Sequence, residues 1–201
     1  MKSKFIVFDG LDGSGKGEMI TRLKDYLSQK GFNVLVTMEP TDGEYGKQAR
    51  AILKTEDDPN ANAEKCLELF VKDRAEHITK EIEPFLSKEN SIVICDRYYY
   101  STIAFQHTQG IELNKLILEN AMFRKPDITF ILDLDAQLAL ERIENRGQSK
   151  EKFEQLEFMK SLRQNFLMLK GQLDDNIVIT DASKSKDEVF TQIKEEINKL
   201  I

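Results

Sequence analysis

The stretch GLDGSGKG at residues 10–17 decides the fold of this 201-residue chain. It fits the pattern G-x-x-x-x-G-K, and it follows an apolar run at residues 5–8 and precedes a helical pattern. Glycines in such a loop let several backbone N–H groups surround a phosphate, and the N-terminus of the next helix adds partial positive charge. Lys16 can then reach the outer phosphates of a nucleotide. The stretch therefore predicts a nucleotide phosphate site.

The loop departs from its usual pattern at the last position. Ser or Thr normally stands there and binds Mg²⁺ through its hydroxyl, but Gly17 has no side-chain ligand. Three interpretations stay open. Mg²⁺ is held through water and by acidic groups elsewhere, or the position tolerates change, or catalysis is weakened.

The rest of the chain alternates short apolar runs with longer helical patterns. Five runs rich in Ile, Val or Phe have the length of buried strands: residues 5–8, 33–37, 91–95, 128–132 and 176–180. Three helical faces lie between or after them: Met19, Ile20, Leu23 and Leu27, which Gly31 ends; Leu67, Val71, Ile78, Ile82 and Phe85 on one long helix; and Val189, Phe190, Ile193, Ile197 and Leu200. This alternation predicts an α/β fold, with a five-stranded parallel sheet flanked by helices on both faces, in one domain over residues 1–201. Ligands of such folds bind at the carboxyl ends of the strands.

Composition excludes several classes of protein. The 29 Lys and Arg against 35 Asp and Glu give a net charge of −6, which disfavours general binding of nucleic acid. No apolar run approaches the roughly 18 residues of a membrane span, and no secretory signal is present, so a cytoplasmic protein is expected. Cys66 and Cys95 lie in apolar patterns without metal-ligand spacing, which predicts reduced core thiols.

A second polar segment follows the third apolar run, where Asp96 and Arg97 precede three tyrosines and Ser101. Arg can bind a phosphate with two parallel hydrogen bonds. Asp96 can hold that Arg, or Mg²⁺ through water; the alternative is a structural ion pair at the edge of the sheet. At least one of the tyrosines is expected in the core.

Phe70 and Arg74 stand four residues apart and therefore share one helical face. A flat ring beside a five-donor guanidinium suits a planar base with carbonyl edges. The alternative is ordinary packing next to a surface charge.

Arg142 and Arg146 end another helical segment, before Gly147-Gln148-Ser149. A basic, polar lid over about residues 142–153 could close on phosphates and neutralise charge in the transition state. An ordinary solvated face is the alternative.

Taken together, these residues make the chain similar to thymidylate kinases, P-loop enzymes that transfer phosphate from ATP to dTMP. The similarity covers nearly the whole chain. It rests on residues 8–16, Glu39-Pro40, residues 69–77, Asp96-Arg97-Tyr98 with Ser101 and residues 104–106, Lys125-Pro126-Asp127 and Asp181-Ala182-Ser183.

The resemblance implies a P-loop kinase fold, the reaction ATP + dTMP → ADP + dTDP, Mg²⁺ as cofactor and a homodimer, with no nucleic acid or membrane as partner. It implies catalytic roles for Lys16, Arg97 and Arg146. It implies ATP binding by Gly10, Leu11, Asp12, Gly13, Ser14, Gly15, Lys16, Gly17, Arg142, Asp181, Ala182 and Ser183. It implies dTMP binding by Asp12, Phe70, Arg74, Arg97, Ser101, Thr102, Phe105 and Gln106, and an indirect Mg²⁺ contact by Asp96.

Individual roles follow from the same resemblance. Asp12 would contact the 3′-hydroxyl of the sugar, and Phe105 would disfavour a ribose 2′-hydroxyl. Phe70 would stack on thymine, and Arg74 would bind a carbonyl edge. Because Gly13 is uncharged, the transferring phosphate would receive its cation from the lid, where Arg146, Lys150 and Lys152 stand.

Two further departures from the family pattern bear on function. Met38 stands where many relatives have Arg, and Asp42 could repel an anionic substrate unless it faces solvent or a cation. The alternatives are a kinase for another nucleoside monophosphate or for a deoxynucleoside, and a catalytically impaired nucleotide-binding protein.

Overall fold

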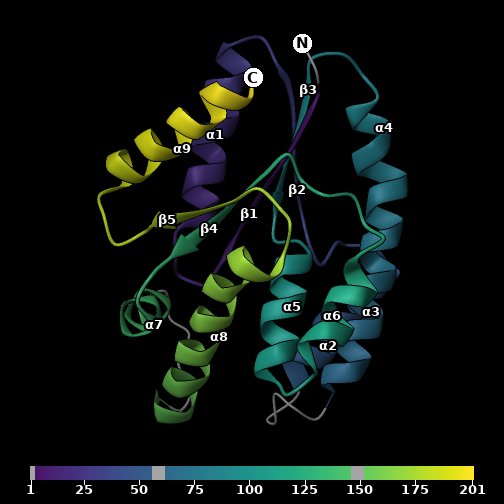
Figure 1. Cartoon of the computed structure of the whole chain (residues 1–201), viewed down its shortest axis with the longest axis vertical. Coiled ribbons are helices and arrows are strands. Elements are labelled where there is room, and N and C mark those ends of the chain that lie inside the picture. The colour runs from purple at the N-terminus through teal and green to yellow at the C-terminus, as the bar shows by residue number, and fades with distance from the viewer. Residues whose placement is uncertain (1–2, 56–61, 146–151) are drawn as a thin grey trace.

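The computed structural model describes residues 3–55, 62–145 and 152–201, and it shows a parallel sheet between two layers of helices (Figure 1). Its strands are β1 (Lys4–Gly10), β2 (Asn33–Met38), β3 (Ser91–Asp96), β4 (Ile128–Asp133) and β5 (Ile177–Asp181). They lie in the order β2-β3-β1-β4-β5, and every neighbouring pair is parallel. The five predicted strands are confirmed, with each boundary within two residues.

Helices cover both faces of this sheet, as the sequence predicted. One face carries α1 (Lys16–Gln29) and α9 (Lys186–Leu200). The other face carries α3 (Ala63–His77), η1 (Ile78–Ile82), α4 (Glu83–Leu86), α5 (Tyr99–Thr108) and α8 (Lys152–Gln172). Three outer helices pack on this second layer: α2 (Glu44–Thr55) on α3, α6 (Leu113–Asn120) on α5 and α7 (Ala136–Glu144) on α8. Because the chain leaves the central strand β1 in one direction and later returns to its other side, a crevice forms at the carboxyl ends of the strands.

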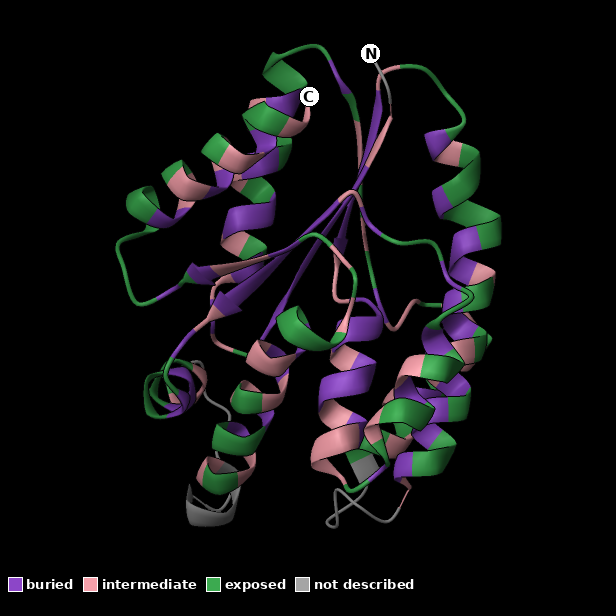
Figure 2. Cartoon of the chain, viewed as in Figure 1, coloured by how far each residue is buried: buried purple, intermediate pink, exposed green. Residues whose placement is uncertain are grey.

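The core is the sheet itself together with the helix faces against it (Figure 2). The three tyrosines at the start of α5, Tyr98, Tyr99 and Tyr100, are all buried, so the prediction of at least one core tyrosine is confirmed. Both cysteines are buried and neither forms a disulfide, and burial raises the pKa of the Cys95 thiol well above its usual value. Cys95 is therefore a core thiol, as expected.

The long helix expected over residues 67–85 differs from a regular α-helix. Its middle, Ile78–Ile82, is a π-helix, in which the N–H of Glu83 donates to the carbonyl of Ile78. Pro84 follows directly and has no N–H to donate to the carbonyl of Lys80, so the regular hydrogen-bond ladder fails here. The wider turn keeps Ile78 and Ile82 buried on the predicted apolar face.

Helix α1 ends at the predicted glycine. Gly31 has φ of 87°, a left-handed conformation that suits a residue without Cβ. In this geometry the N–H of Gly31 donates to Ser28 and that of Phe32 to Leu27, which satisfies carbonyls of the last turn.

Candidate active site

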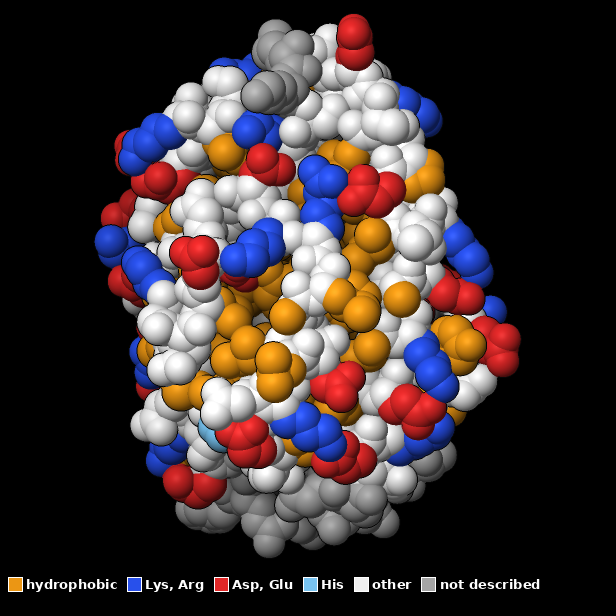
Figure 3. Space-filling model, turned by 45° about the vertical axis from the view of Figure 1, so that its right-hand side comes forward, with side chains coloured by type: hydrophobic (Ala, Val, Ile, Leu, Met, Phe, Trp, Pro, Cys, Tyr) orange, Lys and Arg blue, Asp and Glu red, His pale blue; other side chains and the backbone are white. Residues whose placement is uncertain are grey.

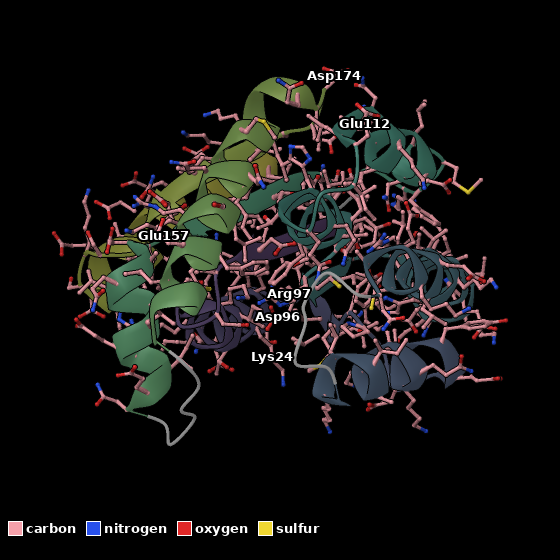
Figure 4. The ribbon with its side chains drawn as sticks, turned by 90° about the horizontal axis from the view of Figure 1, so that it is seen from below. Lys24, Asp96, Arg97, Glu112, Glu157 and Asp174 are labelled. Carbon is pink, nitrogen blue, oxygen red and sulfur yellow. The ribbon has the colours of Figure 1, made fainter. Side chains whose placement is uncertain are left out.

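Two cavities adjoin at the carboxyl edge of the sheet, and Asp12 and Arg97 line both of them. The larger cavity, of about 550 Å³, surrounds the phosphate loop between β1 and α1 and extends to α9. The smaller cavity, of about 200 Å³, lies between the end of β2, α3 and α5. Figure 4, which views the molecule from below, shows Asp96 and Arg97 side by side near its middle.

The phosphate loop has the backbone that its glycines allow. Gly10, Gly13 and Gly15 have φ of 126°, 82° and 96°. A Cβ on Gly10 or Gly13 would lie only 2.6 Å from a backbone carbonyl oxygen, that of Leu132 or Ala139. The loop therefore packs against β4 and α7 with no space for side chains at these two positions. The hydroxyl of Ser14 is buried and has no hydrogen-bond partner among the described residues.

Lys16, the first residue of α1, turns back over the loop. Its Nζ donates to the carbonyls of Gly10 at 3.2 Å and Leu11 at 3.0 Å. Burial, reinforced by the nearby guanidinium of Arg97, lowers the pKa of Lys16 from 10.5 to about 8. The two carbonyls are neutral acceptors, so a phosphate that enters the loop would give the ammonium of Lys16 a negatively charged hydrogen-bond partner.

The backbone of Arg97 has a conformation that few residues other than glycine adopt. Its φ is 68°, in the left-handed region that favours glycine. The buried carboxylate of Asp9 holds the turn, because its Oδ2 accepts the N–H groups of Tyr98 at 3.2 Å and Ser101 at 3.0 Å. Its Oδ1 accepts the Ser101 hydroxyl at 2.6 Å and the N–H of Gly10 at 2.9 Å. Asp9 thus joins the phosphate loop to the Arg97 turn.

The Arg97 guanidinium points toward the junction of the two cavities. Its Nη1 donates to Ser101 Oγ at 2.7 Å, its Nη2 donates to Asp12 Oδ1 at 2.6 Å, and the ring of Phe105 lies 5.5 Å away. Burial alone would lower the pKa of Arg97, but the carboxylates of Asp12, Asp9 and Asp96 outweigh it and raise the pKa above its usual value. The group is therefore a permanent cation.

Asp96 does not hold Arg97 in the way that one sequence interpretation suggested. Among the ion pairs of the described residues, Arg97 pairs with Asp9 and Asp12. Asp96 Oδ1 is buried and has no hydrogen-bond partner within the same residues, and it borders the larger cavity. Burial raises the pKa of the Asp96 carboxyl, although Lys16 and Arg97 act against this shift.

The smaller cavity gathers the residues that the sequence singled out on two separate helices. Phe70 and Arg74 come from α3, while Ser101, Thr102, Phe105 and Gln106 come from α5. The Oε1 of Gln106 is buried without a hydrogen-bond partner in the described part of the chain, and its Nε2 donates to Gln109 at 2.9 Å. The walls are mostly apolar, with a few polar atoms, as is usual for a small-molecule site.

Arg74 is the largest of the fully buried side chains that the structure describes, and it is not a surface charge. Its Nε donates to Glu39 at 2.8 Å and its Nη2 to Thr102 at 2.9 Å. Its Nη2 also lies 2.8 Å from Glu39, and its Nη1 donates to Asn120. Nε, Nη1 and Nη2 thus donate one hydrogen bond each, and the second hydrogen of Nη1 has no partner among the described residues and can serve a ligand.

The far end of the larger cavity is formed by α7 and the loop after β5. Arg142 donates to the carbonyls of Gly13 at 3.3 Å and Ala182 at 3.5 Å, and both Arg142 and Ala182 line the cavity. Asp181 and Ser183 bind one another instead: Asp181 Oδ1 accepts the hydroxyl of Ser183 at 2.6 Å and its N–H at 3.0 Å. They shape the loop that presents Ala182. Arg146 and Lys150 lie outside the described residues, as does the side chain of Lys152.

Comparison of the sequence with known proteins identifies the family. The sequence model of the thymidylate kinase family matches residues 8–193. A probable thymidylate kinase of Pyrococcus horikoshii is 39% identical over 196 residues, which are 96% of this chain and 95% of the relative. A probable thymidylate kinase of Archaeoglobus fulgidus is 36% identical over 98% of this chain and 93% of its own length. The chain belongs to the thymidylate kinase family. A thymidylate kinase of Desulfotalea psychrophila is 34% identical over 98% of this chain and 96% of its own length.

Two residues that depart from the thymidylate kinase pattern, Met38 and Asp42, are exposed to solvent. Met38 is 59% exposed at the end of the edge strand β2 and contributes nothing to either cavity. Asp42 does face a cation, because its carboxylate pairs with Arg50, and its side chain is 98% exposed. Its charge is therefore screened by solvent and by Arg50 from an anionic ligand.

Sequence reasoning missed four buried polar residues that hold this thymidylate kinase site together: Asp9, Glu39, His77 and Asn120. A signal existed for two of them, because Asp9 directly precedes the phosphate loop and Glu39 follows a predicted strand, directly before Pro40. His77 stands three residues after Arg74 on the same helical face. Asn120 lies 46 residues from Arg74, and nothing in the sequence indicates their contact.

Proposed function

We propose that this member of the thymidylate kinase family transfers the γ-phosphoryl group of ATP to dTMP and releases ADP and dTDP. The observation that carries the proposal is the junction of the two cavities. Arg97 and Asp12 line both the cavity of the phosphate loop and the cavity of Phe70 and Arg74. A phosphate that enters beside Arg97 therefore lies next to the phosphates of a nucleotide held by the loop.

ATP occupies the larger cavity in this proposal. Its phosphates take N–H groups of the loop at Asp12, Gly13, Gly15 and Gly17 and the ammonium of Lys16, whereas the N–H of Gly10 is held by Asp9. Its adenine lies between Arg142 and the loop of Asp181, Ala182 and Ser183. Support comes from Arg142, which already bridges the phosphate loop and that second loop.

dTMP occupies the smaller cavity. Arg97 binds its phosphate, Asp12 its 3′-hydroxyl, and Phe105 excludes a ribose 2′-hydroxyl. Thymine stacks on Phe70 and lies between Arg74, Ser101, Thr102 and Gln106. The polar atoms match this base, since Arg74 keeps one N–H for a carbonyl oxygen and Gln106 Oε1 can accept the ring N–H.

The chemical step needs positioning and neutralisation of charge more than a strong base. The acceptor oxygen of a phosphate monoester is already ionised near pH 7. It attacks the γ-phosphorus in line with the departing ADP oxygen while Lys16 and Arg97 stabilise the spreading charge. Arg146 would add a lid cation; this residue lies outside the described part of the chain.

Mg²⁺ is the expected cofactor, and the residues present fit an indirect site. Gly17 offers no hydroxyl, and no group of three or more His, Cys, Asp or Glu side chains among the described residues could hold a metal ion. The unpartnered oxygen of Asp96 borders the phosphate cavity and can hold Mg²⁺ through a water molecule. When bound, the ion would neutralise charge on the β- and γ-phosphates.

A homodimer in the cytoplasm stays a prediction. Figure 3 shows hydrophobic side chains gathered in the middle of one face, with charged side chains around them. The exposed Leu118 and Met122 lie on and just after α6. A second copy of the chain that covers such a face would bury apolar area. Among the described residues, no helix is both long enough and apolar enough to cross a bilayer.

A coupled assay of ADP release with ATP and Mg²⁺ tests the proposed reaction. The acceptors are dTMP, dUMP, UMP, dCMP and AMP. Activity is expected with dTMP and much less with dCMP or AMP, because the polar atoms of the smaller cavity match a base with an N–H between two carbonyls, an edge that uracil shares with thymine. Equal or higher activity with AMP or dCMP would contradict the placement of thymine beside Arg74 and Gln106. Absence of activity with all five would contradict the proposed function.

A further inference from the structure

A buried carboxylate, Glu39, joins the base cavity to a histidine that the proposed mechanism does not use. Glu39 follows β2, its side chain is 5% exposed, and it lines the smaller cavity. Its Oε2 accepts the Nε hydrogen of Arg74 at 2.8 Å and lies 2.8 Å from Arg74 Nη2. Two contacts from one guanidinium fix the plane of that group as well as its position.

The other oxygen of Glu39 is held by His77. The side chain of His77 has no exposed surface, and its Nδ1 lies 3.0 Å from Glu39 Oε1. A carboxylate that pairs with an arginine is ionised and can only accept hydrogen bonds. His77 Nδ1 therefore carries the hydrogen and donates it to Glu39.

The second ring nitrogen of His77 faces Thr37 on β2. Nε2 lies 2.8 Å from Thr37 Oγ1 and 3.4 Å from Glu81 Oε2. Thr37 and Glu39 are two residues apart, and Arg74 and His77 are three residues apart on α3. The end of β2 is thus fastened to one face of α3 by three consecutive contacts: Thr37 with His77, Glu39 with His77, and Glu39 with Arg74.

This arrangement gives Glu39 a single orientation. Both of its oxygens have partners on α3, and rotation of the carboxylate would break the contact with Arg74 at the same time as the contact with His77. Arg74 is further held by Thr102 and Asn120, but Glu39 is the only anion within its described contacts. Arg74 lines the base cavity, and the placement of its guanidinium at that wall therefore depends on Glu39.

We propose that His77 is a positioning residue for the base cavity, because its Nδ1–H fixes the Glu39 carboxylate that orients Arg74 toward the base of the acceptor nucleotide. This inference rests on the proposed function. His77 is not among the residues that line either cavity, and it has no described contact with the phosphate loop. Its removal should therefore affect the acceptor and spare ATP.

Two substitutions of His77 distinguish the roles of its two ring nitrogens. The amide nitrogen of Asn can replace Nδ1, and that of Gln can replace Nε2, so His77→Asn keeps the contact with Glu39 and His77→Gln loses it. We expect His77→Gln to raise KM for dTMP about 10-fold, with kcat and KM for ATP within about 3-fold of the unmodified protein. We expect His77→Asn to keep KM for dTMP within about 3-fold. Asn is one methylene smaller than Gln and leaves the larger gap in the core, so loss of packing alone would give the opposite order, with the larger effect for His77→Asn.

Glu81→Gln is the matched control, because Glu81 approaches the same ring from the half-exposed side. It should leave KM for dTMP unchanged. A second measurement is the double substitution: in a Glu39→Gln background, His77→Gln should add less than about 2-fold to KM for dTMP, since both act through one contact. If a variant is too unstable for kinetics at 25 °C, dTMP binding by calorimetry at 10 °C gives the same comparison.

Three results would overturn the inference: equal effects of His77→Gln and His77→Asn, an equal rise in KM for ATP, or full multiplication of the His77 and Glu39 effects. Failure of the proposed function gives a different result. In that case the unmodified protein neither phosphorylates nor binds dTMP. If only the inference fails, the unmodified protein phosphorylates dTMP, and the His77 variants do not show the expected differences in KM for dTMP.

Discussion

Binding of a nucleotide to the phosphate loop should take up a proton, because Lys16 is partly deprotonated in the empty site. Burial and the neighbouring Arg97 lower the pKa of Lys16 from 10.5 to about 8. This shift disfavours the ammonium by roughly 3 kcal/mol, at 1.36 kcal/mol for each pKa unit. A phosphate group placed beside Lys16 supplies the missing negative charge and raises the pKa again.

The size of the effect follows from the position of that pKa. At pH 8 about half of the empty sites hold neutral Lys16, and at pH 7 about one tenth do. Binding of ADP with Mg²⁺ should therefore take up about 0.5 proton at pH 8 and about 0.1 at pH 7. The unfolded chain holds this proton more tightly than the folded one, so Lys16 also makes stability increase between pH 8 and 10.5.

Calorimetric titrations in two buffers of different ionisation enthalpy measure this uptake directly. Lys16→Arg is the matched control, because a guanidinium stays charged at both pH values and should take up no proton. Uptake below about 0.1 proton at pH 8 would refute the reasoning. Equal uptake by the Lys16→Arg variant would assign the proton to another group.

Three further substitutions test separate parts of the structure. Arg97→Ala should lower kcat/KM for dTMP at least ~100-fold, while KM for ATP stays within ~3-fold, because Arg97 is the cation at the acceptor side of the junction; near-normal turnover would remove Arg97 from the site. Gly17→Ser should fold normally, since a Cβ there meets nothing within 4 Å, and should lower the Mg²⁺ concentration for half-maximal rate several-fold. An unchanged Mg²⁺ titration would show that the missing hydroxyl has no consequence. Gly46→Ala should lower the free energy of unfolding in urea by about 1–3 kcal/mol, because its Cβ would lie 2.1 Å from the carbonyl oxygen of Thr41, whereas Gly171→Ala in the open α8 position should not lower it.

The sheet could be predicted because its strands are buried on both faces. In runs such as residues 91–95, every residue after Ser91 is apolar, and the run stands between helical segments, so the length and order of the strands follow from the sequence. The π-helix at Ile78–Ile82 could not be predicted from apolar spacing, because its buried residues still fall on the expected face. Only the loss of a donor at Pro84 hinted at it.

The site was partly predictable for a related reason. Lys16, Arg97 and Arg74 stand in local patterns, and the structure brings all three to one edge of the sheet. The hydrogen-bond partners of Arg97 and Arg74 could not be predicted. Asp9 lies 88 residues from Arg97, and Asn120 lies 46 residues from Arg74. Such pairs depend on how the elements pack, so the sequence suggested Asp96 as the partner of Arg97 while the structure shows Asp9 and Asp12.

One comparison tests the central claim most directly: kcat/KM for dTMP against kcat/KM for thymidine, with saturating ATP and Mg²⁺. The two acceptors differ only by the phosphate that Arg97 is proposed to hold at the junction of the cavities. The account predicts a preference for dTMP of at least ~1,000-fold, because thymidine offers Arg97 no phosphate to bind and lacks the ionised attacking oxygen. Thymidine as good an acceptor as dTMP would contradict it.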